Sequence, residues 1–571
     1  MNRNVESHFA LNPTDIKLRR SRFDRSFDIK TTFNVGDVIP FYCDEVLPGD
    51  TFDVSTSKIV RLQTLLRPIM DNIYLDTYYF FVPNRLVWQH WQEFCGENNQ
   101  SAWIPKTEYS IPQLKAPTGG WNVGTLADYF SIPTGIEGLS VNALPFRAYA
   151  LIMDQWFRDE NLTDPLLIPD GDAESQGVNT GNYINDTALG GLPFKAAKYH
   201  DYFTSCLPSP QKGPDVSIPI SDFSGNFPVV PLEDTVDSSL ITNHYSAITI
   251  DNPTVPSGTG YMDGSIGFQA NNLTPGSFVG KDVVFPQVIN DNGSPNVNST
   301  MPIINNLWAV NTGMAQAATI NDLRNAFAVQ KLYEKDARGG TRYIEVIKSH
   351  FGVTSPDARL QRAEYLGGNR IPITISEVVQ QSGTPTSEGT PLGNLAAMSK
   401  TADTHSDFIK SFVEHGYVIG VMVARYDHTY QQGLRRLFSR KDRFDFYWPV
   451  FANLGEQAVL NKEIYAQGTA DDDKVFGYQE AWADYRYHPS VCTGEMRSTY
   501  SETLDSWHLG DKYESLPTLS DSWIREDGTV VDRTLAVSSR LSDQIMADIY
   551  VRNYATRPMP MYSIPGLLNH A

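Results

Sequence analysis

Cysteine is scarce in this sequence, and the few cysteines present are far apart. The 571 residues contain four of them, Cys43, Cys95, Cys206 and Cys492. None stands in a C-x-x-C arrangement, so the spacing indicates neither a zinc site nor a disulfide framework. We expect free, buried thiols in a protein of a reducing cytosol.

Long apolar runs are also lacking. No stretch approaches the ~20 apolar residues that a membrane-spanning helix requires. The first residues, MNRNVESHFALNP, have no apolar centre of the kind found in signal peptides. We therefore expect a protein without a membrane role that is made, and first assembles, in the cytoplasm.

Positive charge is low overall and unevenly distributed. The net charge is −20, and the isoelectric point of about 5.0 argues against a wholly basic coat for nucleic acid. Residues 213–305 contain Lys281, no arginine and nine acidic residues, a net charge of −8. Residues 1–30 contain seven basic and four acidic residues, a net charge of +3. An acidic internal segment thus contrasts with a basic first segment.

Glycine, proline and aromatic residues are plentiful, which favours one β-rich body with long loops over several linked domains. The strands we expect are Ile73–Val82, Ile371–Val379, Tyr417–Arg425 and Ile545–Val551. Tyr417–Arg425 is apolar at nearly every position and should be buried on both faces. In Ile545–Val551 the residues alternate between two faces, so this strand should be half-buried. Two helices are expected, over Arg85–Phe94 and Asn142–Asn161. Strands near both extremes of the chain favour an antiparallel jelly roll that pairs early segments with late ones.

The stretch Thr319–Asn369 has the clearest local design. Thr319 and Asp322 fit a helix-capping pattern, and Gly339 and Gly340 supply the positive φ angles that end a helix. A second, shorter helix should follow and end near Phe351. A helix, a Gly-Gly hinge and a second helix, dense in both charges, indicate an interaction element over residues 319–351.

Six segments, in this order, resemble the major capsid proteins of the microviruses, small icosahedral single-stranded DNA bacteriophages, and specifically their gokushovirus branch. They are FNVGDVIPFYCDEVLPGDTFD (33–53), DARGGTRYIEVIKSHFGV (336–353), SPDARLQRAEYLGG (355–368), EHGYVIGVMVARYDHTYQQGLRRLFSRKDRFDFYWPVFANLGEQAV (414–459), VFGYQEAWADYRY (475–487) and RPMPMYSIPGL (557–567). The resemblance covers nearly the whole chain except residues 213–305.

This resemblance implies a mainly β fold: a single eight-stranded antiparallel viral jelly-roll barrel whose long loops contain helices and a β-rich surface insertion. It also implies a T=1 icosahedral capsid around circular ssDNA, built from copies of this chain through pentamer precursors in the bacterial host cytoplasm. Further implied partners are a small basic DNA-binding protein, an internal scaffolding protein and a host surface receptor, with no cofactor. The division we expect is a basic arm (1–30), a first part of the jelly roll (31–212), a surface insertion that forms a threefold protrusion for host attachment (213–305), and the rest of the jelly roll with the C-terminal strands and tail (306–571).

Two basic segments are candidates for DNA binding, because lysine and arginine neutralise phosphates. In the arm, which alternatively clasps a neighbouring subunit, the candidates are Arg3, Lys17, Arg19, Arg20, Arg22 and Arg25. In Leu434–Trp448, where basic and aromatic residues alternate, they are Arg435, Arg436, Arg440, Lys441 and Arg443. The second segment equally suits a subunit contact. The candidates for subunit interfaces are Leu323, Phe327, Arg338, Gly339, Gly340, Arg342, Phe438 and Trp448.

No catalytic or metal site can be identified from the sequence. Asp471–Asp473 lacks the glycine and the distant glutamate of a calcium loop, so it is interpreted as a solvated acidic turn, and the histidines show no metal spacing. The alternatives from other classes are a jelly-roll carbohydrate-active hydrolase and a cytoplasmic ssDNA-binding protein. We expect a structural protein and not an enzyme.

Overall fold

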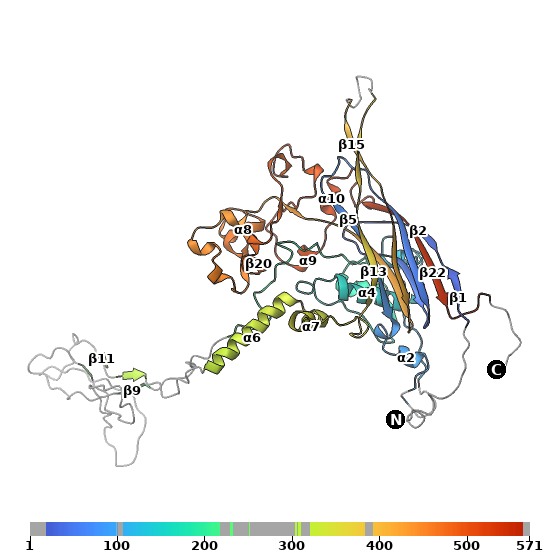
Figure 1. Ribbon diagram of the computed structural model, residues 1–571, viewed down its shortest axis with the longest axis horizontal. Helices are drawn as coiled ribbons and strands as arrows, with labels where there is room; N and C mark the ends of the chain where they lie inside the picture. Colours follow the sequence, from blue (N-terminus) through green and yellow to red (C-terminus); the bar gives the residue numbers. More distant parts are fainter. Residues whose placement is uncertain are drawn as a thin grey trace, which may run out of the picture. The chain divides into compact units, whose positions relative to one another are not determined.

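Two antiparallel β-sheets face each other across the main hydrophobic core (Figure 1). The computed structural model describes residues 19–98, 100, 107–216, 320–382 and 392–562, and the backbone of four short strands at 229–231, 250–251, 303–304 and 307–309. The chain forms two compact units, residues 1–214 with 332–571, and residues 215–331. Both large sheets belong to the first unit.

The first sheet pairs the earliest described strands with the last one. It contains β1 (Ser21–Asp24), β2 (Phe27–Phe33), β4 (Thr51–Leu62), β16 (Thr401–Ser411) and β22 (Ile545–Arg557). β1 lies opposite Tyr554–Arg557 and β2 opposite Ile545–Val551, so together they flank one side of β22. β4 flanks the other side, from Ile545↔Leu62 to Thr556↔Thr51. In Figure 1 the blue and red strands accordingly lie side by side.

The second sheet has the order β13 (Glu364–Pro372), β5 (Ile73–Pro83), β17 (Gly416–Tyr426), β3 (Ile39–Val46). β5 and β17 are in register from Ile73↔Tyr426 to Pro83↔Gly416. Both faces of this sheet are covered, so ten of the eleven residues of β17 are buried. The predictions of a doubly buried strand here and of a half-buried strand at Ile545–Val551, where buried and exposed residues alternate, are confirmed.

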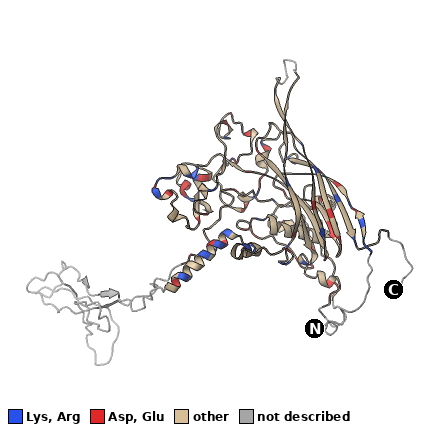
Figure 2. Ribbon diagram, viewed as in Figure 1, with Lys and Arg blue, Asp and Glu red and all other residues tan. Residues whose placement is uncertain are grey.

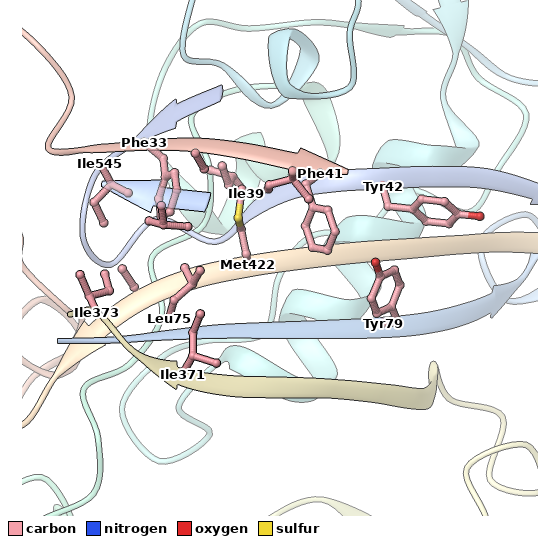
Figure 3. Close-up of a cluster of buried hydrophobic side chains, with 14 of the residues drawn as sticks. Phe33, Ile39, Phe41, Tyr42, Leu75, Tyr79, Ile371, Ile373, Met422 and Ile545 are labelled. Atoms are coloured by element: carbon pink, nitrogen blue, oxygen red, sulfur yellow. The ribbon is translucent and has the colours of Figure 1, made fainter. Parts of the chain in front are cut away.

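The core lies between the two sheets, and its side chains come from both. Figure 3 shows part of this core, with Leu75 and Met422 from the second sheet, Phe33 and Ile545 from the first, and Tyr79 beside Tyr42. Burial of aliphatic and aromatic side chains stabilises the pair of sheets by about 1.5–3 kcal/mol for each fully buried side chain. This core is the main source of stability of the first unit.

A second cluster covers the other face of the second sheet. The helix α4 (Leu144–Ile152) supplies much of it and continues as a wider π turn at Met153–Phe157. The helix predicted to reach Asn161 ends at Arg158, because the Asp159 carboxylate accepts the amides of Asn161 and Leu162 and holds the chain in a turn.

The remaining elements are short, apart from α6 with its 20 residues. The strands are β6 (Gln113–Lys115), β7 (Ser140–Asn142), β8 (Ser175–Gln176), β14 (Ile375–Val379), β15 (Leu395–Ser399), β18 (Thr429–Tyr430), β19 (Gln457–Leu460), β20 (Val475–Gln479) and β21 (Ser490–Val491). The helices are α2 (Trp91–Phe94), α3 (Leu126–Tyr129), α5 (Tyr183–Asp186), α6 (Ile320–Gly339), α7 (Tyr343–Phe351), α8 (Asn461–Ile464), α9 (Asp521–Ile524) and α10 (Thr529–Asp532). In the second unit, β9 (Val229–Pro231) pairs with β12 (Leu307–Ala309), and β10 (Ile250–Asp251) pairs with β11 (Ile303–Ile304).

Three local predictions were wrong. Arg85–Phe94 contains one turn at Asn84–Leu86 and one at Trp91–Phe94, because Trp88 between them is fully buried and donates to Asp172. Ile371–Val379 divides at Ile373 between β13 and the β14–β15 hairpin, whose upper end projects beyond the sheets in Figure 1. Residues 21–30, which we placed in a basic arm outside the jelly roll, form β1 and most of β2 because β22 supplies their backbone partners.

Candidate functional site

The segment 434–454 forms an exposed aromatic surface. Three single turns, at Arg436–Phe438, Arg443–Asp445 and Pro449–Phe451, hold it together. Phe438 is 68% exposed and Trp448 is 47% exposed. The exposed apolar side chains of this aromatic surface are Leu434, Leu437, Phe438, Phe444, Phe446, Tyr447, Trp448, Val450 and Leu454. A continuous run of this kind is typical of an interaction surface.

Two of the five basic candidates in this segment bind other parts of the chain. Arg436 donates to the carbonyl oxygen of Ala458 at 3.0 Å and lies 3.5 Å from the Glu463 carboxylate. Arg440 forms an ion pair with Asp484 and lies 4.3 Å from the centre of the Tyr485 ring. The other three, Arg435, Lys441 and Arg443, are exposed. These three are therefore the basic side chains of the segment that are best placed to meet a ligand.

The predicted helix, hinge and helix are present at α6 and α7. Gly340 has a φ of +89° and follows the end of α6, which confirms its helix-ending role. The same prediction was wrong for Gly339, which is the last residue of α6 and has no positive φ. Gly352 has a φ of +69° after α7. Thr319, the predicted cap, lies outside the described residues. The division between the two units falls within α6, after Lys331. Figure 2 shows both charges along this helix.

The interface candidates in these helices differ in exposure. Phe327 is exposed and Leu323 is half-buried. Arg338 forms an ion pair with Glu456. Arg342 directs its guanidinium inward and donates to the carbonyl oxygens of Asp154 and Arg158 at 3.1 and 2.9 Å. Arg342 thus attaches α7 to the segment that follows α4.

The arm candidates that the structure describes lie beside acidic groups. Arg19 and Arg20 are exposed. Arg22 lies 4.1 Å from the Tyr554 ring centre and 3.9 Å from Asp53, while Arg25 lies 2.7 Å from Asp44. Arg22 thus links β1 to β22 and β4 of the first sheet, and Arg25 links the segment after β1 to β3 of the second sheet. Arg3 and Lys17 lie outside the described residues.

A surface cavity of about 670 Å³ lies on the outer face of the first sheet. Residues of β2, β4 and β22 line it, together with the loop 123–131. Its charged side chains are of both signs, Lys30, Arg61, Asp128, Asp543 and Asp548. This mixture does not favour one class of small ligand.

No short-range pattern in the sequence indicates that a buried histidine lies between two carboxylates. His428 lies 3.0 Å from Asp511 through Nδ1 and 3.3 Å from Glu526 through Nε2, and all three side chains are almost fully buried. Burial favours the neutral ring, but the attraction of Asp511 and Glu526 raises the pKa of His428 to about 10. The charged form of His428 is therefore favoured at neutral pH.

A second buried ion cluster surrounds Asp76 in β5. Arg370 and Arg425 approach its carboxylate at 2.7 and 2.6 Å, and the Tyr199 hydroxyl donates to it at 2.9 Å. Burial acts to raise the pKa of Asp76, but these partners outweigh burial and hold it below its usual range. The cluster stabilises the pairing of β13, β5 and β17.

The three carboxylates of the acidic turn Asp471–Asp473 bind lysines and backbone amides of the chain. Asp471 binds Lys474, Asp473 binds Lys462, and Asp472 accepts the amides of Gln467 and Gly468.

Within residues 19–98, 100, 107–216, 320–382 and 392–562, no three His, Cys, Asp or Glu side chains are placed to hold a metal ion. In the same ranges, no helix has the length and apolar character to cross a membrane. All four cysteines are free as predicted, although Cys206 alone is buried.

Known proteins resemble this chain over almost its whole length. Residues 13–567 match the family described as "Capsid protein (F protein)". Capsid protein VP1 of Chlamydia phage 1 is 42% identical over 591 positions, with 99% of this chain and 98% of the relative covered. Capsid protein VP1 of Spiroplasma virus 4 is 42% identical over 541 positions, with coverage of 94% and 93%. Capsid protein VP1 of Bdellovibrio phage phiMH2K is 41% identical over 568 positions, with coverage of 99% and 98%. These matches confirm the resemblance found in the sequence, and the chain belongs to the phage capsid protein (F protein) family.

Proposed function

We propose that this protein is the major capsid protein of a gokushovirus-type microvirus, and that its copies form a T=1 icosahedral shell around a circular ssDNA genome. The observation that carries the proposal is the match to capsid proteins over nearly the whole chain. The relatives are named for a structural role, so the chain is a capsid protein of the virion and not the hydrolase considered above.

The two large sheets support a jelly-roll barrel of eight strand positions. β1 and β2 flank successive parts of β22 and occupy one position together. Each sheet then has four positions, β1/β2–β22–β4–β16 and β13–β5–β17–β3. Such a barrel provides a rigid body on which long loops carry the contacts between subunits.

The mechanism of this protein is assembly. Contacts repeated under closed symmetry stabilise a shell even when each of them is modest. Pentamer precursors, an internal scaffolding protein and a small basic DNA-binding protein complete the proposed pathway, which takes place in the bacterial cytoplasm. Electron microscopy and analytical ultracentrifugation of the chain expressed with its co-encoded partners test it: closed, uniform particles are expected, and a persistent monomer contradicts the proposal.

The aromatic surface at 434–454 is proposed to contact a neighbouring subunit. The double variant Phe438→Ser with Trp448→Ser should leave the subunit folded, since both side chains are largely exposed. Loss of two aromatic anchors should nevertheless prevent closed particles, because single interface anchors contribute about 2 kcal/mol or more. Particle yield in sucrose gradients measures this effect.

A charge-only variant is the matched control for the aromatic surface. Replacing Arg435, Lys441 and Arg443 by glutamine removes the exposed cations and keeps the aromatic rings. This variant should still form particles with normal DNA content. Empty particles from the charge variant, together with normal particles from the aromatic variant, would instead assign the segment to ssDNA binding.

The insertion at 213–305 is proposed to form a threefold protrusion that attaches to a host surface receptor. Its net charge of −8, without arginine, favours a solvent-facing role over contact with DNA, and residues 215–331 form a compact unit of their own. Replacing residues 213–305 by a short Gly/Ser linker should leave particles that no longer adsorb to cells. As a control, an equal-length Gly/Ser replacement of residues 383–391, between β14 and β15, should leave adsorption intact. Adsorption at the normal level by the insertion variant would contradict the receptor role.

A further inference from the structure

Two carboxylates meet at the hinge between α6 and α7. The backbone N–H of Arg342 donates to Glu160 Oε2 at 3.0 Å and to Glu345 Oε2 at 3.1 Å. One N–H is thus shared by an oxygen of each side chain, so the two carboxyl groups are in mutual contact range. Glu160 belongs to the segment after α4, whereas Glu345 belongs to the first turn of α7.

The surroundings bring the pair close together and partly exclude water. The side chain of Glu160 is 12% exposed and that of Glu345 is 33% exposed. A Cβ atom at Gly340 would lie 2.4 Å from Glu345 Oε2 and 2.9 Å from Glu160 Oε1. Because Gly340 has no side chain, the space beside its Cα atom is free for both carboxyl groups.

Among the described residues, Arg342 is the cation within ion-pair distance of both carboxylates. The Arg342 guanidinium lies 3.8 Å from Glu160 and 3.4 Å from Glu345, so it serves both. The Lys212 ammonium is buried and makes no hydrogen bond within the described part of the chain, and burial lowers its pKa. The other charged groups facing this site are Arg362, which pairs with Asp357, and Asp336, which binds His350 at 2.7 Å.

We propose that Glu160 and Glu345 share one proton and act as a pH-dependent latch that holds α7 against the segment after α4. With one proton bound, the Glu345 carboxyl donates to the Glu160 carboxylate and the contact is attractive. With no proton bound, two like charges face each other across the hinge, which costs free energy in a half-buried site. The latch then weakens, and α7 detaches more readily.

The pKa directions of the two glutamates agree with a shared proton, and they determine in which direction of pH the contact weakens. Burial raises the pKa of Glu345, and the neighbouring Glu160 raises it further. Burial also acts to raise the pKa of Glu160, but hydrogen bonds from Glu345 and Thr341 and the charge of Arg342 outweigh it and lower the pKa. The contribution of Glu345 is therefore complete below its ordinary pKa of 4.5 and is lost as the pH rises through its higher folded value. The two groups titrate as a pair.

Hydrogen–deuterium exchange of the full-length chain tests the latch. Exchange of the α7 peptide, corrected for the intrinsic pH dependence of amide exchange, should be roughly several-fold faster at about pH 8 than at about pH 5, because the fully deprotonated pair holds α7 less tightly. Glu345→Gln retains a neutral hydrogen-bond donor and should abolish this difference. Glu160→Gln removes one of the two charges and should abolish it as well.

Glu495→Gln, at an exposed position in another turn, is the matched control and should behave like the unmodified chain. Equal corrected exchange of α7 at both pH values in the unmodified chain would overturn the proposal. So would an undiminished pH dependence in either Gln variant, and because there are two variants, misfolding of one leaves the test valid. The latch concerns a single chain, so failure of this test leaves the proposed shell role intact, and failure to form particles leaves the latch intact.

Discussion

Replacing His428 by alanine is expected to lower the free energy of unfolding of the subunit by about 3–5 kcal/mol, the usual cost of removing one partner from a buried ion cluster. The histidine is the cation between Asp511 and Glu526, and their side chains are 5% and 0% exposed. Without the ring, two carboxylates remain buried with only Lys198, 3.8 Å from Asp511, as a nearby cation. Thermal and urea unfolding of the purified chain measure the loss.

Two further variants make the His428 result specific. His488→Ala, at an exposed position, should change the free energy of unfolding by less than about 0.5 kcal/mol. Adding Asp511→Asn and Glu526→Gln to His428→Ala should recover part of the loss, because the cost arises mainly from the uncompensated carboxylates. Equal stability of His428→Ala and the unmodified chain would contradict a stabilising role for the ion cluster.

The same cluster makes the stability of the unmodified protein depend on pH in a defined way. The pKa of His428 is raised from 6.5 to about 10, so its stabilising contribution is complete below pH 6.5 and is lost as the pH rises through 10. Burial acts to raise the pKa of Asp511, but His428 and Lys198 outweigh burial and lower it to about 2. The contribution of Asp511 is therefore present above its ordinary value of 3.8 and is lost as the pH falls through 2.

Replacing both Gly339 and Gly340 by valine is expected to abolish closed particles. A Cβ atom at Gly339 would lie 2.6 Å from Ser349 Oγ, and one at Gly340 would lie 2.4 Å from Glu345 Oε2. The positive φ of Gly340 adds about 1–2 kcal/mol of strain for any L-residue with a side chain. Together these effects force α6 and α7 apart, and particle yield should fall below detection in electron micrographs.

Gly352→Val is the matched control for the hinge variant. Gly352 also has a positive φ, +69°, but a Cβ atom there would meet nothing within 4 Å. This substitution retains the backbone strain and omits the collisions, so particles should still form. Normal particle yield from the double variant would show that the geometry of the hinge is not required for assembly.

The sequence predicted the strands whose burial is regular and missed features that depend on distant residues. The alternation at Ile545–Val551 and the apolar run at Tyr417–Arg425 determine which faces are buried, and both strands are present. Arg85–Phe94 has a helical pattern, yet Trp88 is placed by its bond to Asp172, 84 residues away. Periodicity carries no information on such a tertiary partner.

The candidate surfaces were predictable in outline only. The alternation of basic and aromatic residues in Leu434–Trp448 located an exposed segment correctly. It did not show that Arg436 and Arg440 bind Glu463 and Asp484, because these partners follow at least 27 residues later. His428, Asp511 and Glu526 were not found for the same reason, since no short-range pattern joins them.

The position of β22 in the first sheet has a consequence for how the protein is synthesised. Every other strand of the two large sheets precedes β22 in the chain, yet β1, β2 and β4 all take their backbone partners from it. While the ribosome is still translating residues before Ile545, these early strands have unpaired edges and an open core. Nascent chains with exposed strand edges aggregate readily and are bound by chaperones. Interrupted translation before Ile545 would therefore release a chain whose first sheet lacks its central strand, and only completed subunits would enter assembly.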